Sequence, residues 1–402
     1  MSKFFTRERF GTPQLLAGFL LLAFLIQCVW LISHQQPGLV FPDELSRVHE
    51  GVGQWQGHGV AGTETALLTS ADDVRMRGPA YDTDHSPLWY LIEAAPVALF
   101  RVSPDSAAWV WLTRAPFLVL GILLGASLWY VSRRLYGNAG GYTALALYCF
   151  SPSVVRASTL WFSPPHIGAA WGTFGAVFTA IAVSHTLYAP REVVLWNWRR
   201  ILLLGVSLAL AIGSQFSLVI ILPLLLIFML YLAPERWAAA LAILGSACVV
   251  ALFLLYCTYF LHASLFAHGL VNAVIFRGTA VALGMPVAYA QVGRELATSG
   301  PVLVVLAPVC LGFWIAWRRA RYFGNTAPLV VAVLFLALRV ASPHGPDSIY
   351  GLLGAIFLFV FVAGVASDLL ETKARELAGA VLIGLLAANA LFNVISLARV
   401  GH

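Results

Sequence analysis

Apolar residues fall in blocks of about 20 along most of this chain, and short polar segments separate them. A block of this length is what an α-helix needs to cross the hydrocarbon core of a bilayer. A transmembrane β-barrel would alternate apolar and polar residues along shorter segments instead. The pattern therefore predicts an all-α polytopic membrane protein.

The blocks predict eleven spans, at roughly 14–33, 107–132, 140–157, 167–188, 200–214, 217–233, 237–260, 301–317, 327–342, 349–367 and 377–397. The stretch 200–233 is divided in two because it is too long for one tilted span, and the polar run Gly213-Ser214-Gln215-Phe216-Ser217 supplies a corner. Residues 88–101 are apolar but short and contain Glu93 and Pro96, so we expect a helix that lies in the membrane interface.

Composition agrees with this prediction. The chain has 402 residues, of which 60% are hydrophobic and only 10% are charged, whereas soluble proteins carry about 25% charged residues. The cysteines all fall inside apolar blocks without metal-ligand or redox spacing, which is typical of small core residues: Cys28, Cys149, Cys248, Cys257 and Cys310. The net charge of +6 does not indicate a nucleic-acid partner, because the basic residues are distributed according to the side of the membrane that each loop faces.

The distribution of basic residues predicts which loops face the cytoplasm. Lys3, Arg7 and Arg9 place the N-terminus inside, and the predicted inside segments hold 14 of the 24 Lys and Arg residues. If 88–101 crossed the membrane, or if 200–233 were one span, later basic clusters would face outward. The eleven-span prediction therefore puts the C-terminus and the long loops 34–106 and 261–300 on the outside.

The first outside loop opens with an acidic pair, Asp43 and Glu44, shortly after the first span, and His49 follows. A carboxylate near the membrane surface can act as a general base, and a carboxylate pair can hold a divalent cation. Glu44 can instead cap or orient a helix that starts near Leu45. An ordinary solvated loop is the alternative.

A second candidate is the run His85-Ser86-Pro87-Leu88-Trp89-Tyr90. Proline is tolerated in the first turn of a helix, so Pro87 predicts the start of the interfacial helix. Trp89 and Tyr90 suit the headgroup level, and His85 at a helix N-terminus can reach a phosphate. The alternative is an interfacial anchor without a ligand.

Cationic residues recur near the outer ends of later spans. Arg156 and His166 flank an aromatic, proline-containing loop that can bind phosphate or stack on a sugar, or that is simply a turn. Arg339 lies just inside the outer end of its span, where an arginine is costly and is a functional candidate unless it snorkels to the surface. Further candidates are Arg277, Arg294, His344, Asp347 and Tyr350.

Four landmarks together resemble the GT-C class of polyprenyl-phosphate-sugar glycosyltransferases, which contains protein O-mannosyltransferases and aminoarabinose transferases. They are the acidic pair Asp43-Glu44, the run His85–Tyr90, the segment from Leu112-Thr113-Arg114-Ala115-Pro116 to Ser132-Arg133-Arg134-Leu135-Tyr136-Gly137, and the corner 213–217 followed by Pro223. The resemblance covers about residues 10–235, with a weaker echo at 339–360.

The resemblance implies a GT-C-like catalytic membrane core at 1–235, with 236–402 as more variable helices of the same membrane domain. It implies sugar transfer on the outer face of the plasma membrane, from a polyprenyl-phosphate donor to a glycolipid, polysaccharide or protein acceptor. Asp43 would be the base, with Glu44 beside it, and arginines and histidines would hold the donor phosphate.

The chain also departs from the family pattern. Many relatives have an acidic residue in the second outside loop, where this chain has Pro164, Pro165 and His166. A metal ion, if one is used, would then fall to Asp43 and His166. Two other functions remain open: a transporter or flippase of a lipid-linked or small polar substrate, and a non-catalytic lipid-binding relative.

Overall fold

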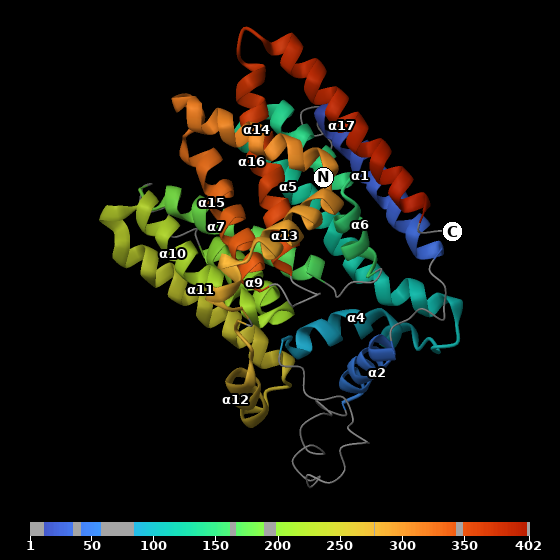
Figure 1. Ribbon diagram of the computed structural model, residues 1–402. Helices are drawn as coiled ribbons and strands as arrows, with labels where there is room; N and C mark the ends of the chain where they lie inside the picture. The colour runs from blue at the N-terminus through green and yellow to red at the C-terminus, as the bar shows by residue number, and fades with distance from the viewer. Residues whose placement is uncertain are drawn as a thin grey trace, which may run out of the picture. The chain divides into compact units, whose positions relative to one another are not determined.

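The computed structural model describes residues 12–34, 42–57, 84–160, 166–188, 198–276, 278–342 and 349–399. Helices alone make up the regular structure of these residues. They form two compact units, one of residues 1–35, 121–164 and 277–402 (unit 1) and one of residues 36–120 and 165–276 (unit 2). Figure 1 labels the helices of each unit.

Among the described residues, seven helices are long and apolar enough to cross a membrane: Pro13–Ser33, Ala107–Cys149, His166–Thr186, Pro234–Thr258, Phe323–Ala341, Ile349–Leu370 and Arg375–Ala398. An eighth span results if α13 (Pro286–Ser299) and α14 (Pro301–Ala316), bent by 112°, count together. A polytopic all-α membrane protein is thus confirmed, and the count of eleven spans stays a prediction.

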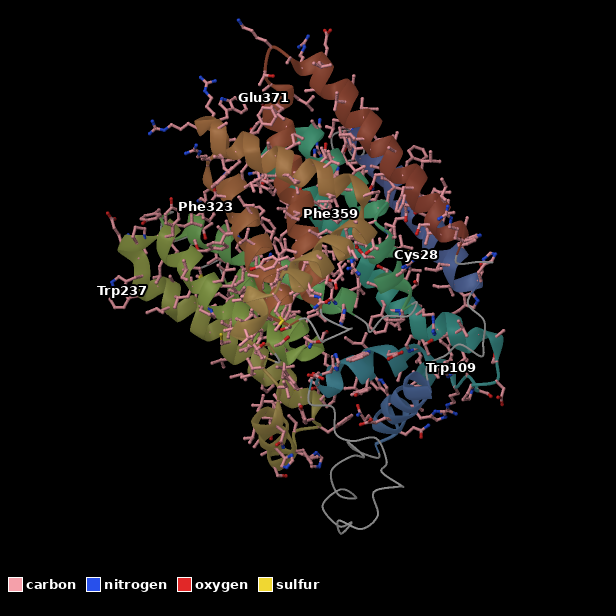
Figure 2. All side chains as sticks on the ribbon, viewed as in Figure 1. Cys28, Trp109, Trp237, Phe323, Phe359 and Glu371 are labelled. Atoms are coloured by element: carbon pink, nitrogen blue, oxygen red, sulfur yellow. The ribbon has the colours of Figure 1, made fainter. Side chains whose placement is uncertain are left out.

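Unit 1 is built around α16 (Ile349–Leu370), which packs against α14, α15 (Phe323–Ala341) and α17 (Arg375–Ala398). Small residues let the helices approach: a Cβ on Gly364 would lie 2.1 Å from Asn325 Oδ1. Such residues are favoured between membrane helices, where close van der Waals contact drives association. Phe359 lies in this core (Figure 2).

The remaining elements of unit 1 are α1 (Thr12–Ser33), residues 121–149 of α5 (Ala107–Cys149), α6 (Pro152–Thr159), and short 3₁₀ turns η4 (Ala280–Gly284) and η5 (Arg318–Ala320). Gly137 interrupts the helical backbone of α5 with φ 75° and ψ −171°, a conformation that favours glycine. The predicted break between 132 and 140 is therefore present.

The prediction of one helix over 140–157 is wrong. Helix α5 ends at Cys149, and α6 begins at Pro152 after the extended residue Ser151. A proline has no N–H to continue the α5 hydrogen bonds, but it fits the first turn of a new helix.

An amide clasp of three residues, Gln27, Asn389 and Asn393, holds α17 against its neighbours in unit 1. Asn393 Nδ2 donates to Gln27 Oε1, and Gln27 Nε2 donates to the Cys149 carbonyl at 3.2 Å. Asn389 Nδ2 donates to the Phe150 carbonyl at 3.0 Å. The clasp joins α17 to α1, which run side by side in Figure 1, and to the α5–α6 turn.

Unit 2 has α7 (His166–Thr186), α9 (Trp198–Ser214) and α11 (Trp237–Thr258) in close contact. Glycines again set the spacing, since a Cβ on Gly172 would lie 2.4 Å from Ala211 N. The unit is completed by residues 107–120 of α5, α2 (Pro42–Trp55), α4 (Pro87–Phe100), η2 (Phe216–Ile220), α10 (Ile221–Leu232), η3 (Pro234–Arg236) and α12 (Ala263–Asn272).

The predicted break at 213–217 is confirmed, because α9 ends at Ser214 and η2 begins at Phe216. The segment before α4 explains it. The Gly213 carbonyl accepts from Ser86 N at 2.9 Å and Ser86 Oγ at 2.7 Å, and Phe216 N donates to the Asp84 carbonyl. These bonds replace the helical hydrogen bonds that would otherwise continue α9.

Candidate functional site: an acidic helix turn and two groups of cationic residues

Helices α2 and α4 of unit 2 pack along one another in an antiparallel pair (Figure 1). Near one end Trp55 Nε1 donates to the Leu91 carbonyl at 2.9 Å, and toward the other Val48 packs with Ala94, Val97 and Trp109. Between them Gly51 permits the close approach, since a Cβ there would lie 2.4 Å from the Tyr90 carbonyl oxygen. Both helices have 14 residues and are too short to cross a bilayer.

The acidic pair lies in the first turn of α2, because that helix begins at Pro42, three residues before the expected start at Leu45. Carboxylates are favoured there by the partial positive charge of a helix N-terminus. The side chains of Asp43 and Glu44 lie outside the described residues. His49, one and a half turns further along, is exposed.

The expected helix start at Pro87 is confirmed, and the location of this helix in the membrane interface stays a prediction. Helix α4 begins at Pro87 in the first-turn position, and the Ser86 hydroxyl caps it by accepting from Leu88 N at 3.3 Å. His85 lies just before this cap, with its ring 4.1 Å edge-on to the Trp89 ring. Trp89 Nε1 in turn donates to the buried carboxylate of Glu93 at 3.2 Å.

His166 at the start of α7 is buried close enough to His85 for their charges to interact. Its Nε2 atom has no hydrogen-bond partner within the described part of the chain, and neither do Gln215 Oε1 and Ser217 Oγ beside the α9–η2 break. Buried polar atoms are nearly always satisfied in folded proteins. This part of unit 2 therefore has hydrogen-bonding capacity available for a ligand.

The antiparallel pairing separates two residues that the sequence suggested as metal partners. Asp43 lies at the end of α2 that is near the C-terminal end of α4, whereas His166 lies near His85 at its N-terminal end. A 14-residue helix is about 20 Å long. Among the side chains that the structure describes, no three His, Cys, Asp or Glu residues gather as a metal site.

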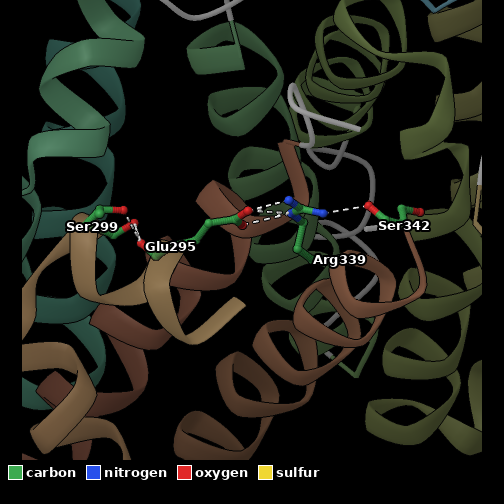
Figure 3. Close-up of polar contacts among 5 residues, drawn as sticks. Glu295, Ser299, Arg339 and Ser342 are labelled. Atoms are coloured by element: carbon green, nitrogen blue, oxygen red, sulfur yellow. Dashed lines mark hydrogen bonds and ion pairs between the residues drawn. The ribbon is translucent and has the colours of Figure 1, made fainter. Parts of the chain in front are cut away.

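In unit 1, Arg339 is occupied by a carboxylate that the sequence did not single out. Arg339 Nε donates to Glu295 Oε1 and Oε2 at 3.1 and 2.9 Å, Nη2 donates to Oε1, and Nη1 donates to the Ser342 carbonyl at 2.6 Å. Figure 3 shows this fork between α13 and α15. Arg339 is 2% exposed and Glu295 34% exposed. Arg339 thus has an internal partner and does not snorkel to the surface.

Helix α13 brings further candidates of unit 1 together, since it contacts α6, α15 and α16. Arg156 on α6 is half-buried, and its Nε has no partner among the described residues. Arg294 on α13 is exposed. Tyr350 on α16 is buried, with its ring near Phe335. Arg277 and His344 lie outside the described residues, as does Asp347.

Two charged residues with partners inside the protein, Glu295 and Arg114, were not among the sequence candidates. Glu295 was overlooked because its partner lies 44 residues away, a separation that no local pattern reveals. Arg114 on α5 is fully buried in unit 2 and donates to Thr113 Oγ1 at 2.8 Å. Arg114 belongs to one of the four motifs of the family resemblance but was not named as a site candidate. Its position inside an apolar block could have identified it, since a buried charge is costly.

No protein-family model and no curated protein matches this chain. Among solved structures, the chain is similar to the oligosaccharyltransferase of Archaeoglobus fulgidus, crystallised as a complex with zinc and sulfate, with a TM-score of 0.49 and 16% sequence identity. The match covers 77% of this chain and 44% of that one, so the chain spans less than half of that protein's length.

Proposed function

We propose that this protein is an integral membrane glycosyltransferase that moves a sugar from a polyprenyl-phosphate donor to an acceptor on the extracytoplasmic face. The observation that carries the proposal is the α2–α4 pair. Two short helices lie side by side. One begins at the acidic motif and carries Asp43 and Glu44 in its first turn, and the other begins within the run His85–Tyr90. The acceptor is a glycolipid, a polysaccharide or a protein, and the localisation is the plasma membrane with the N-terminus in the cytoplasm.

In the proposed reaction an acceptor hydroxyl or amine attacks the anomeric carbon of the donor sugar. The bond from that carbon to the phosphate oxygen breaks, and the polyprenyl phosphate leaves with the electron pair. Asp43 accepts the acceptor proton as general base. Glu44 is the second carboxylate of the turn, and a divalent cation held there is the alternative use of the pair.

Each unit offers its own group of candidate side chains for binding the donor phosphate. In unit 1 Arg156 is supported by its buried, unpartnered Nε, and Arg294 by its exposure on the adjoining helix. In unit 2 His166 is supported by its unpartnered Nε2 and by its proximity to His85. The remaining proposed contacts are His49, Arg277, Arg339, His344 and Tyr350.

The test is sugar transfer by the Asp43→Asn variant in membranes that contain lipid-linked sugars, with Glu44→Gln as the matched control. General-base catalysis contributes about 10²–10⁴-fold. We expect Asp43→Asn to lose at least the lower end of that range while expression and membrane insertion are unchanged, and Glu44→Gln to retain more activity. Full transfer by Asp43→Asn would rule out the proposed base.

Sidedness has its own test. A periplasmic reporter fused at residue 104, between α4 and α5, is expected to be active, because α4 is too short to cross the bilayer. A reporter active only in the cytoplasm at this position would overturn both the interfacial helix and the outward-facing active site.

A transporter is the second candidate, and the Glu295–Arg339 pair favours it. Ionisable pairs inside membrane proteins often mark substrate or proton pathways. Reconstituted protein separates the two functions, because a transferase yields a new glycosidic bond, whereas a transporter moves its substrate between leaflets or compartments unchanged.

A further inference from the structure

Helix α12 and its flanking turns present an apolar surface outside the spanning helices. This helix follows α11 after four residues, and its ten residues measure about 15 Å, too short to cross a bilayer. No Asp, Glu, Lys or Arg occurs between Arg236 and Arg277. Six large hydrophobic side chains are each more than a third exposed, which we call the α12 apolar surface: Phe260, Leu261, Leu270, Val271, Ile275 and Phe276.

The turn between α11 and α12 fixes how this surface is held. Phe260 and Leu261 adopt φ of 53° and 61°, the left-handed region that side chains other than glycine rarely enter. Tyr256 Oη donates to the Leu261 carbonyl at 2.5 Å. Such a backbone persists only where surrounding contacts determine it. Helix α12 is therefore attached to the end of α11 by a defined turn.

Aromatic packing completes the attachment. The Phe266 ring of α12 lies 5.4 Å from the rings of both Tyr256 and Tyr259 at the end of α11. Because Phe266 and the buried Gly269 face inward, the opposite side of α12 faces outward, and Val271 there is 84% exposed. The fold thus directs this apolar side chain away from the protein.

The outward side of α12 is divided into two stripes. Ser264, His268 and Asn272 follow at a spacing of four, and Asn272 Nδ2 contacts His268 Nδ1 at 2.8 Å. Ala263, Ala267 and Leu270, at a spacing of four and then three, are exposed on the adjoining side of the helix, and Val271 lies at the border with Ser264. Residues four apart share one helix face, so a polar and an apolar stripe run parallel to the helix axis. This is the pattern of a helix at a membrane interface.

We propose that α12 lies in the interface of the bilayer, with the α12 apolar surface embedded among lipid chains and the Ser264-His268-Asn272 stripe at headgroup level. The half-buried Tyr256 at the end of the 22-residue helix α11 supports this depth, since tyrosine is enriched at membrane interfaces. The absence of formal charge on the whole segment removes the electrostatic cost of lipid contact. The proposal does not depend on the reaction that the protein performs.

A lipid surface fits these side chains better than a second copy of the chain. The six exposed hydrophobics present an area on the order of 500 Å², enough to mark an interaction surface. Stable protein interfaces bury about 800 Å² on each partner. The α12 apolar surface is thus too small to hold a dimer by itself. A helix that is already attached to a membrane span needs only a small area of lipid contact to stay at the bilayer surface.

Spin labels at His268 and Leu270 test the proposal, in protein whose accessible Cys248 and Cys257 are replaced by alanine and serine. The two positions are both exposed and lie on one helix, but on different stripes. In nanodiscs of phosphatidylcholine and phosphatidylglycerol, collision rates with oxygen and with a water-soluble nickel chelate are measured. We expect the oxygen-to-nickel ratio to be several-fold higher at Leu270 than at His268.

Two outcomes overturn the proposal. Equal, high nickel accessibility at both positions would place α12 in water. Low accessibility to both reagents at Leu270 would show that protein covers the surface. The same samples in detergent serve as the folding control, because labelling at both positions and an unchanged helical circular dichroism spectrum show that neither substitution disrupts the helix.

Discussion

Two polar contacts inside unit 1 join distant parts of the chain by different means. The Glu295–Arg339 pair joins α13 to α15 through full charges, with the arginine almost completely buried. The amide clasp joins α17 to α1 and to the α5–α6 turn with neutral groups only. Arg339 and the clasp residues lie on apolar helices, whereas Glu295 lies on the more polar α13.

The difference lies in what remains when one partner is removed. A buried guanidinium without its carboxylate keeps a charge that the protein interior solvates poorly. An amide without its partner leaves one unsatisfied polar atom, and interhelical hydrogen bonds in membrane proteins contribute on average about 0.6 kcal/mol. The charged contact is therefore expected to be the more sensitive of the two to the loss of one partner.

The largest effect is expected from Glu295→Ala. This variant leaves Arg339 buried and unpaired, and we expect a loss of about 3 kcal/mol in the free energy of unfolding, the lower end of the range for broken buried pairs because Glu295 is partly exposed. Denaturation in detergent measures it. Arg294→Ala, on the neighbouring exposed residue, is the control and should change stability little. Equal losses of stability in the two variants would show that the ion pair contributes no more than a neighbouring exposed residue.

A smaller effect is expected from Asn393→Ala in the amide clasp. Loss of the Asn393–Gln27 hydrogen bond should lower stability by about 1 kcal/mol. A double-mutant cycle with Gln27→Ala measures the coupling of the two side chains. If the coupling exceeded the effect of Glu295→Ala, the contrast between charged and neutral contacts would be wrong.

The smallest effect is expected from Gly351→Ala on α16. A Cβ at this position would lie 2.8 Å from Glu295 Oε2, so the carboxylate must shift within the ion pair, which should cost less than about 1 kcal/mol. Gly293→Ala, whose Cβ would meet open space on α13, is the matched control. In a Glu295→Ala background the Gly351→Ala loss should disappear, and its persistence would show a cause other than the ion pair.

Much of the helical framework could be predicted from the sequence because each signal is local. Pro87 after Ser86 predicts a helix start, and the polar corner at 213–217 predicts a helix break; both are present. The helix over 140–157 was predicted wrongly, because the helix-start signal Ser151-Pro152 inside the predicted span was not taken into account. The segment 261–300, which was predicted as a loop, contains the helices α12 and α13. They were missed because both are too short to be recognised as membrane spans.

The candidate sites were less predictable, because they depend on contacts between distant residues. The acidic turn at Asp43 was found from its place after the first span, but its separation from His166 follows from the antiparallel α2–α4 pairing. Arg339 was recognised as costly, whereas its partner Glu295 looked like any loop carboxylate. The clasp residues fell inside predicted apolar spans and were not singled out. Asn389 and Asn393 are four residues apart on one face of α17, and this spacing could have indicated a polar contact with another helix.

The uncharged stretch between Arg236 and Arg277 has a consequence for biosynthesis. The insertion machinery orients a helix by the lysines and arginines within about 15–20 residues of its ends. Helix α11 has Arg236 directly before it, whereas Arg277 lies near the limit of that range beyond Thr258. The orientation of α11 is thus decided mainly by one arginine and by the helices inserted before it. Basic residues added to α12 would compete with that signal before the protein has folded.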